Sequence, residues 1–330
     1  MTLPETMRAM RVTALDGPSA LALQEIPLPD IAGAALVEVH AAGVAFADLL
    51  LTRGKYQMKP EPPFIPGSDI AGIVVRAPEG APVRVGQRVA GAPLTGAWAE
   101  YAAASAQMLF PIPDGMDFAA ATSLTVNYQT SYFALMERGQ LKPGETVLVH
   151  GAAGGVGSAA VQIAAAGGAH VIAVAHGDDK RRTAVESGAA QALEAEGPWL
   201  EEVRALTDGR GVDVVYDPVG GDRFLDSVRS LAPGGRLLVV GFAGGSIPSV
   251  QVNRLLLRNT SVVGVAWPEY ARVDPEMPQR CAAGLAAMHA AGYIKPVVGA
   301  VFPLEQAAEA LRVIEERRAV GKVVLQIRQS

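Results

Sequence analysis

The sequence predicts a two-domain α/β protein that combines a β-rich, barrel-like unit with a doubly wound parallel sheet. Three observations predict this architecture. Residues 1 to about 124 hold short β-like runs, such as 36–40 and 70–75, separated by Pro and Gly, which is typical of a barrel-like unit. From about residue 125, continuous apolar strands alternate with helical segments, as a parallel sheet covered on both faces requires. A glycine-rich turn joins the first of these strands to its helix.

The bulk composition is that of a globular protein without a polyanionic partner. A chain of 330 residues suits two domains. Half of the residues are apolar, 18% are charged, and the net charge is -5 without a long run of one sign. This pattern argues against a surface for nucleic acid or for an anionic membrane.

Cys281 is the single cysteine, so the chain forms no internal disulfide and has no cysteine-rich zinc site. A single thiol fits a reducing cytoplasm. Residues 1–11 lack the apolar core of a signal peptide, and Gly, Pro or charge interrupts every apolar stretch before a membrane-spanning length. We therefore expect a cytoplasmic protein that is not embedded in a membrane.

The first unit ends near residue 124. Within it, four prolines crowd together in one segment, which we expect to be an extended loop: Pro60, Pro62, Pro63 and Pro66. The second unit, 125–265, should hold strands at 146–150, 170–175, 213–216, 236–240 and 261–265, with a helix at 156–166 that ends at Gly167 and Gly168. Residues 266–330, with helices near 281–291 and 304–317 and a strand at 321–327, are expected to return to the first unit.

The turn from Gly151 to Gly157 lies directly between a strand and a helix. Glycine in such a turn lets the backbone approach a pyrophosphate, and the helix N-terminus offers free N–H groups to it. The context favours a dinucleotide site over a glycine-rich turn without a ligand. An ATP-type loop is excluded because no Lys-Ser or Lys-Thr follows. The expected pyrophosphate residues are Ala152, Gly154, Gly155, Val156 and Gly157.

The end of the second strand indicates which nicotinamide cofactor binds. A site that prefers NAD has an acid there for the ribose 2′-hydroxyl, whereas this strand ends at Ala175. Lys180, or as second choice Arg181, could instead meet a 2′-phosphate. Alternatively, these cations only solvate a helix start capped by Asp178 or Asp179. The sequence predicts NADPH.

Six segments together resemble the quinone reductases of the medium-chain dehydrogenase/reductase family. They cover nearly the whole chain in the right order: 43–56, 66–72, 151–157, 211–221, 241–245 and 321–324. The resemblance implies a GroES-like catalytic domain that is split in sequence by an inserted Rossmann domain. It also implies an NADPH:quinone oxidoreductase.

Zinc divides this family into branches. The zinc alcohol dehydrogenases carry Cys and His at the positions of Ala45 and Ser68, and they have a four-cysteine lobe that is missing here. The five histidines show no ligand spacing and are interpreted as packing or surface residues: His40, His150, His170, His176 and His289. We expect no bound metal.

Without a metal, the cofactor supplies the hydride from C4 of its nicotinamide to a quinone or a polarised C=C bond. The protein then needs a donor for the developing oxyanion or enolate, and Tyr56 and Asp48 are the candidates. In the related enoyl-thioester reductases, a tyrosine at the position of Tyr56 is the proposed proton donor. The alternatives are a rim aromatic for Tyr56 and a helix-start role for Asp48. Ala45 and Leu50 replace polar residues of some quinone reductases, so a more apolar acceptor pocket follows.

The resemblance implies further roles. Thr130 would lie near the nicotinamide amide, and Gly241, Phe242 and Ala243 would line the dinucleotide groove. Arg318 would approach the 2′-phosphate, unless it is only an exposed cation at a helix end. Trp267 and Tyr270 are candidates for the acceptor pocket. Family dimers commonly join through the strand matching 261–265, so a homodimer is expected.

Two alternative functions stay open at this point. One is a 2-enoyl-thioester or enone reductase. The other is a non-catalytic relative of the crystallin type or a protein that binds single-stranded nucleic acid. A pI of about 5.6 and the lack of a basic stripe argue against nucleic acid.

Overall fold

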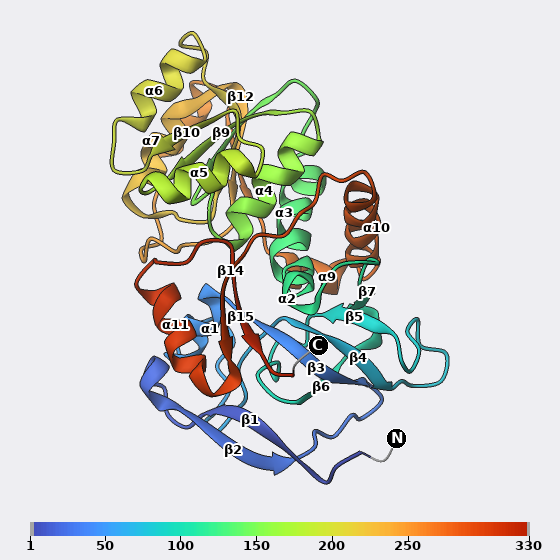
Figure 1. Cartoon of the computed structure of the whole chain (residues 1–330). Helices are drawn as coiled ribbons and strands as arrows, with labels where there is room; N and C mark the ends of the chain where they lie inside the picture. The colour runs from blue at the N-terminus through green and yellow to red at the C-terminus, as the bar shows by residue number, and fades with distance from the viewer. Residues whose placement is uncertain (1–2, 329–330) are drawn as a thin grey trace. The chain divides into compact units, whose positions relative to one another are not determined.

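The computed structural model describes residues 3–328, which form two compact units (Figure 1). Unit 1 combines residues up to Val126 with those from Pro296 onward, and unit 2 holds Asn127–Lys295. Unit 1 is β-rich, and unit 2 is built on a parallel sheet. The predicted fold class is therefore confirmed.

Unit 1 contains a two-stranded antiparallel sheet, β1–β2, and a seven-stranded sheet in the order β14-β15-β3-β4-β5-β7, with β6 paired to β3. Every pairing in the larger sheet is antiparallel except the parallel β14–β15 pair. The strands of unit 1 are β1 Thr6–Val12, β2 Leu21–Pro27, β3 Ala35–Val44, β4 Ile70–Arg76, β5 Arg88–Gly91, β6 Tyr101–Ala104, β7 Leu109–Pro111, β14 Val298–Pro303 and β15 Lys322–Gln326. The helices are η1 Gly17–Ala20, α1 Phe46–Thr52, η2 Ala106–Met108, α2 Phe118–Ala121, η6 Leu304–Gln306 and α11 Ala307–Glu315.

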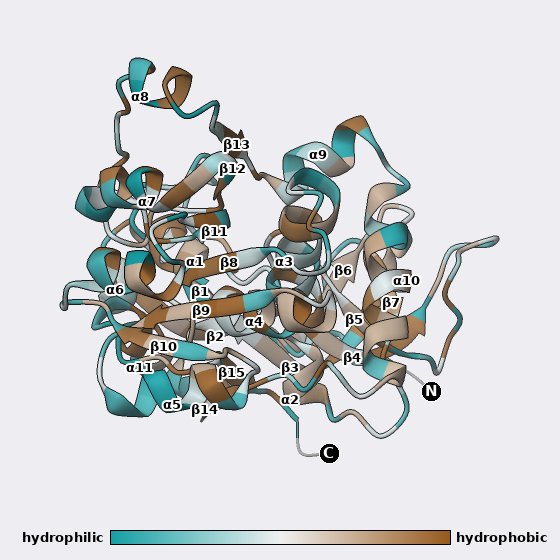
Figure 2. Ribbon diagram, turned by 90° about the horizontal axis from the view of Figure 1, so that it is seen from above, coloured by the Kyte–Doolittle hydropathy of each residue, from teal (hydrophilic) through white to brown (hydrophobic). Residues whose placement is uncertain are grey.

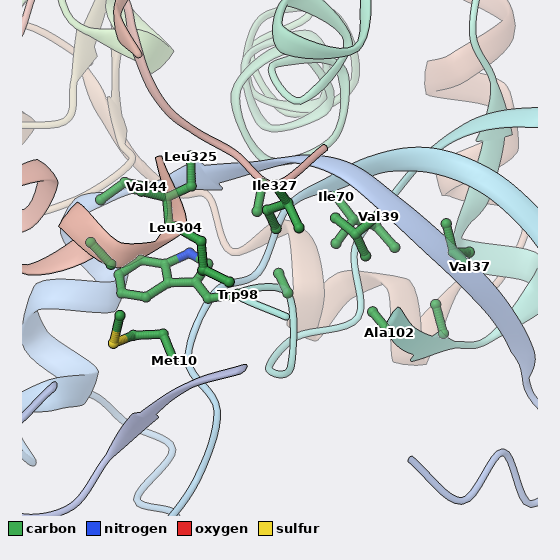
Figure 3. Close-up of a cluster of buried hydrophobic side chains, with 14 of the residues drawn as sticks. Met10, Val37, Val39, Val44, Ile70, Trp98, Ala102, Leu304, Leu325 and Ile327 are labelled. Carbon is green, nitrogen blue, oxygen red and sulfur yellow. The ribbon is translucent and has the colours of Figure 1, made fainter. Parts of the chain in front are cut away.

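Trp98 belongs to a cluster of buried apolar side chains in unit 1 (Figure 3). Its indole is completely buried, and Nε1 donates a hydrogen bond of 2.9 Å to the carbonyl of Gly43. Gly67 has a φ of +94°, and a Cβ there would overlap with the indole ring. The indole therefore contacts the backbone of two segments: Gly43 at the end of β3, and Gly67, which directly precedes Ser68.

Unit 2 is built on a six-stranded sheet in the order β10-β9-β8-β11-β12-β13, in which all pairings are parallel. Its strands are β8 Thr146–His150, β9 His170–Ala175, β10 Gln191–Glu194, β11 Val212–Asp217, β12 Leu231–Val239 and β13 Ser261–Gly264. The order reverses direction between β8 and β11. Open α/β sheets bind their ligands outside the carboxyl ends of the strands at such a point.

Helices of unit 2 pack around this sheet (Figure 1). They are α3 Thr130–Tyr132, η4 Phe133–Arg138, α4 Gly155–Ala166, α5 Asp178–Glu186, α6 Trp199–Leu206, η5 Gly221–Arg223, α7 Phe224–Ser230, α8 Asn253–Leu256, α9 Trp267–Val273 and α10 Met277–Ala290. A further helical segment, η3 Leu124–Gln129, contains the point at which the chain passes from unit 1 to unit 2. Strand β10 was not expected from the sequence.

The chain re-enters unit 1 at Pro296, later than the expected position near residue 266. Helices α9 and α10 therefore belong to unit 2. Gly284 of α10 lies so close to the Tyr132 ring that a Cβ there would overlap with it. The Gln162 amide of α4 accepts from the backbone N–H of Lys295 at 2.9 Å and donates to the carbonyl of the same residue at 2.8 Å. These contacts between residues distant in sequence set the second boundary, which local patterns do not reveal.

Among residues 3–328, no helix combines the length and the apolar character needed to cross a membrane.

Candidate active site

The glycine-rich turn connects β8 to α4 at the reversal point of the sheet in unit 2. Gly151 turns the chain with a φ of +58°, and α4 begins at Gly155. A Cβ on Gly157 would overlap with the carbonyl oxygen of Gly151, so this glycine permits the close packing of helix on turn. The turn has the geometry expected of a pyrophosphate cradle, and Ala152 is fully buried within it.

Three buried polar residues that the sequence interpretation missed hold this turn. Ser131 Oγ donates to the carbonyl of Val156 at 2.9 Å and lies 2.9 Å from the hydroxyl of Tyr216. The Asn127 amide fills the space where a side chain on Gly155 would stand. Ser131 thereby ties the short helix α3, whose first residue is Thr130, to the start of α4. The available sequence signal was the mostly polar run 127–131, which directly precedes an apolar segment.

The carboxyl end of β9 places the two predicted cations next to each other. Ala175 is buried, Gly177 follows with a φ of +80°, and α5 then carries Lys180 and Arg181 in its first turn. Burial lowers the pKa of Lys180. Arg181 forms an ion pair with Asp178. Both cations thus lie near the place where a dinucleotide fold holds the adenosine ribose. The helix N-cap is Gly177, not Asp178 or Asp179 as one interpretation expected.

A carboxylate that the sequence interpretation missed lies at the same edge of the sheet. Glu194 is the last residue of β10, and it pairs in register with Ala175. Its Oε2 accepts from the backbone N–H of Gly177 at 2.9 Å, and its Oε1 lies 3.0 Å from Nδ1 of His176. Glu194 could not be found from the sequence because strand β10 was not predicted. A strand of four residues, Gln191–Glu194, has no clear apolar pattern.

The loop after β12 brings Gly241, Phe242 and Ala243 to the same carboxyl edge. The backbone N–H of Ala243 donates to the carbonyl of Pro218 at 3.1 Å. Asp217, which ends β11, accepts from the backbone N–H groups of Val219 and Gly220, both at 2.9 Å. The loops that follow β11 and β12 therefore support each other.

In unit 1, Asp48 connects the two segments in which zinc dehydrogenases carry metal ligands. Its Oδ2 accepts from the backbone N–H of Ala45 at 2.8 Å, and its carboxylate also accepts from the backbone of Gly67. Ser68 follows directly. Burial of the carboxyl, together with the nearby charge of Asp69, raises the pKa of Asp48 to about 7. This placement matches the helix-start role that was weighed for Asp48, and a catalytic role stays a prediction.

An ion pair that the sequence interpretation missed lies beside Asp48. Lys322 Nζ meets Asp69 Oδ2, and the two side chains are 2% and 0% exposed. The other carboxylate oxygen accepts from Thr125 Oγ1 at 2.6 Å and from the backbone N–H of Val126 at 2.9 Å. Gly43 leaves the room that the lysine occupies, since a Cβ there would overlap with Lys322. A charged residue within each of two apolar motifs was the available signal.

The remaining predicted residues are dispersed over the two units. Tyr56 is half-buried in the loop after α1, and Arg318 is an exposed residue just after α11 that pairs with Glu316 at 2.6 Å. In unit 2, Trp267 is buried in α9, and the Tyr270 ring lies 5.1 Å from the ring of Phe133. The roles of all four stay predictions.

Metal-ligating side chains do not gather in the part of the chain that the structure describes. Within residues 3–328, no group of three or more His, Cys, Asp or Glu side chains could hold a metal ion. At the positions where zinc dehydrogenases have Cys and His, this chain offers the methyl group of Ala45 and the hydroxyl group of Ser68.

Comparison with known proteins agrees with this architecture. Residues 31–114 match the model of the alcohol dehydrogenase GroES-like domain, and residues 155–283 match that of the zinc-binding dehydrogenases. The chain is 39% identical to the rat quinone oxidoreductase-like protein 2, over 97% of this chain and 92% of the relative.

Two solved structures have the same fold over nearly the full length of the chain. One is a probable oxidoreductase from Mycobacterium abscessus, with a TM-score of 0.90 and 43% identity over 98% of this chain and all of that one. The other is the Escherichia coli quinone oxidoreductase in complex with NADPH, with a TM-score of 0.89 and 28% identity over 97% of this chain and all of that one. The chain belongs to the medium-chain dehydrogenase/reductase family, in its group of quinone oxidoreductases. It is an oxidoreductase of that family.

Proposed function

We propose that this protein transfers a hydride from NADPH to a quinone, or to a related electrophilic carbonyl or alkene acceptor, without a metal ion. The observation that carries the proposal is the turn from Gly151 to Gly157 at the reversal point of the sheet in unit 2. The quinone oxidoreductase relatives support the reaction class.

NADPH is the cofactor that the described residues fit. The backbone N–H groups between Ala152 and Gly157 would hold the pyrophosphate, and Lys180 would meet the 2′-phosphate. Ser131 keeps Thr130 near the start of α4, where Thr130 would contact the nicotinamide amide. Bound there, NADPH supplies the hydride.

The absence of metal ligands in this region supports a reaction without zinc. Ala45 has no atom that can ligate a metal ion, and Ser68 is a poor zinc ligand. The buried ion pair between Asp69 and Lys322 lies next to Ser68 in the chain, because Asp69 directly follows Ser68. In this region the protein orients the acceptor and excludes water, and Tyr56 is the side chain proposed to donate to the developing oxyanion.

A homodimer is part of the proposal. Strand β13 is the last strand of its sheet, so one of its edges has no partner strand among residues 3–328. Four side chains of the segment that leads to it are between 74% and 79% exposed: Ile247, Val252, Leu256 and Leu257. Figure 2 shows hydrophobic colour at α8 and β13. A second copy that covers this surface would extend the sheet and bury its apolar side chains.

The decisive experiment is NADPH oxidation against a panel of quinones, enones and enoyl thioesters, after dialysis against a metal chelator. We expect turnover with quinones, full activity after dialysis, and NADPH bound at least about tenfold more tightly than NADH. Lys180→Ala should weaken NADPH and leave NADH nearly unchanged. Stoichiometric zinc lost together with the activity, or equal affinity for both cofactors, would contradict the proposal.

A further inference from the structure

Glu194 lies where a dinucleotide fold recognises the adenosine ribose. In such folds the ribose 2′-group meets the residue at the end of the second strand, which here is Ala175. Figure 1 shows β9, β10 and α5 next to one another. Because Glu194 pairs in register with Ala175, the neighbouring strand brings a carboxylate to the place where the second strand has none.

The carboxylate is fixed in that place by the residues that follow Ala175. Its partners are the backbone N–H of Gly177 at 2.9 Å, Nδ1 of His176 at 3.0 Å and the backbone N–H of Glu196 at 3.3 Å. The hydrogen bond from Gly177, followed by that from Glu196 and by His176, lowers the pKa of Glu194 to about 2. Glu194 is therefore ionised under all conditions in which the enzyme would be assayed.

Glu194 also lies within ion-pair distance of Arg181, one of the two cations predicted to meet a 2′-phosphate. Arg181 Nε lies 3.8 Å from Glu194 Oε2, and the other end of the guanidinium pairs with Asp178. Arg182 pairs with Asp179 in the same way. In this region two of the three cations, Arg181 and Arg182, are thus paired with carboxylates. A 2′-phosphate would bring roughly -1.5 to -2 of charge to this region.

We propose that Glu194 is a specificity-determining residue, whose carboxylate limits the preference of this enzyme for a 2′-phosphorylated cofactor. The proposal rests on the cofactor site of the proposed function. Glu194 would repel the 2′-phosphate that Lys180 attracts. A cofactor with a free 2′-hydroxyl would meet little repulsion from the carboxylate, whereas the 2′-phosphate of NADPH would be repelled by its negative charge.

Glu194→Gln tests this directly, because glutamine keeps an oxygen that can accept from Gly177 and loses the charge. Dissociation constants would be measured for NADPH and NADH, and for the fragments 2′,5′-ADP and 5′-AMP, which isolate the phosphate. We expect NADPH and 2′,5′-ADP to bind about threefold to tenfold more tightly, and NADH and 5′-AMP to change by less than about twofold. The gain should shrink as salt is raised.

Two further variants make the test specific. Glu196→Gln removes an exposed carboxylate two residues away and should change NADPH binding by less than about twofold. Glu194→Asp keeps the charge and should keep the wild-type preference. The inference is overturned if Glu194→Gln leaves NADPH binding unchanged or weaker, or if Glu196→Gln has the same effect. Weaker NADPH binding in both Glu194 variants would assign the residue to loop structure and also overturn it.

The same titrations distinguish a failure of the proposed function from a failure of the role proposed for Glu194. A wild-type protein that binds NADPH no better than NADH contradicts the proposed cofactor, whatever the variants do. A wild-type preference for NADPH that Glu194→Gln does not increase contradicts only the role of Glu194.

Discussion

At the scale of single residues, two neighbouring carboxylates in unit 1 differ in their partners. Asp69 has a cation, because Lys322 lies against it, while the direct partners of Asp48 are backbone N–H groups. Hydrogen bonds from neutral donors only partly offset the cost of burying a charge. The pKa of Asp48 is accordingly raised to about 7.

Asp48 should make the stability of unit 1 depend on pH. A carboxyl whose pKa is higher in the folded state contributes stability that is complete below its unfolded pKa, near 4, and is lost as pH rises through 7. The loss can reach about 1.4 kcal/mol per pH unit in that window. Asp48→Asn cannot ionise, so its melting temperature should fall less than that of the wild type between pH 5 and 8.5. The exposed Asp114→Asn control should follow the wild type, and a parallel fall in Asp48→Asn would contradict the assignment.

Tyr56 separates the two enzymatic interpretations. A quinone is easily reduced and needs little help from a protein acid, whereas an enoyl thioester gives a basic enolate, for which a placed donor contributes about 10²–10⁴-fold. With quinones as acceptors, we expect Tyr56→Phe to alter mainly KM, and NADPH affinity to stay unchanged. Steady-state kinetics of this variant with a quinone and with an enoyl thioester provide the measurement. A kcat loss above about a hundredfold with the quinone, in a folded protein, would identify Tyr56 as the proton donor.

At the scale of elements, two glycines in the turn between β8 and α4, Gly154 and Gly157, differ in the space that surrounds them. Gly157 makes the packing of α4 on the turn possible, because a Cβ there would overlap with Gly151. Gly154 has room, since its Cβ would stand 3.4 Å from the nearest neighbour, the carbonyl oxygen of Gly151. Gly157 is therefore required by the packing of the fold, whereas the packing leaves room for a side chain at Gly154.

The corresponding prediction compares Gly154→Ala with Gly157→Ala. Gly154→Ala should fold normally, with a melting temperature close to that of the wild type. It should bind NADPH at least about tenfold more weakly, because the methyl group would meet the pyrophosphate. Gly157→Ala should lose thermal stability as well as binding. Thermal melting and cofactor titration on both variants are needed. Unchanged NADPH affinity in Gly154→Ala would show that the pyrophosphate does not approach this turn.

At the scale of the whole molecule, the exposed edge of β13 and the apolar side chains around α8 predict a dimer. Its mass should be about twice the 34.2 kDa of the chain, measured by light scattering at micromolar concentration. The double variant Leu256→Glu, Leu257→Glu should shift the mass toward the monomer, since charges on this surface oppose its burial. Val85→Glu, at an exposed valine of unit 1, is the control and should not shift it. A monomeric wild type would contradict the proposed dimer.

The sequence by itself determined the elements whose cause is local. Apolar runs of strand length predicted β8, β9, β11, β12 and β13, and the glycine-rich sequence predicted the turn between β8 and α4, where the pyrophosphate is proposed to bind. The absence of an acid at Ala175 and the cations that follow it predicted NADPH. Each of these features depends on residues within one short segment, where side-chain periodicity and backbone conformation are readable from composition and spacing.

Only the tertiary structure decided which distant residues meet. Asp69 and Lys322 are 253 positions apart, and their pairing depends on the arrangement of β15 beside β3 and of β3 beside β4. Glu194 lies beside Ala175 at the carboxyl end of β9 because β10 pairs with β9 in one particular register. A shift of one residue would turn its side chain to the other face. Register and long-range packing are properties of the assembled sheet, so no local pattern could have placed these charges.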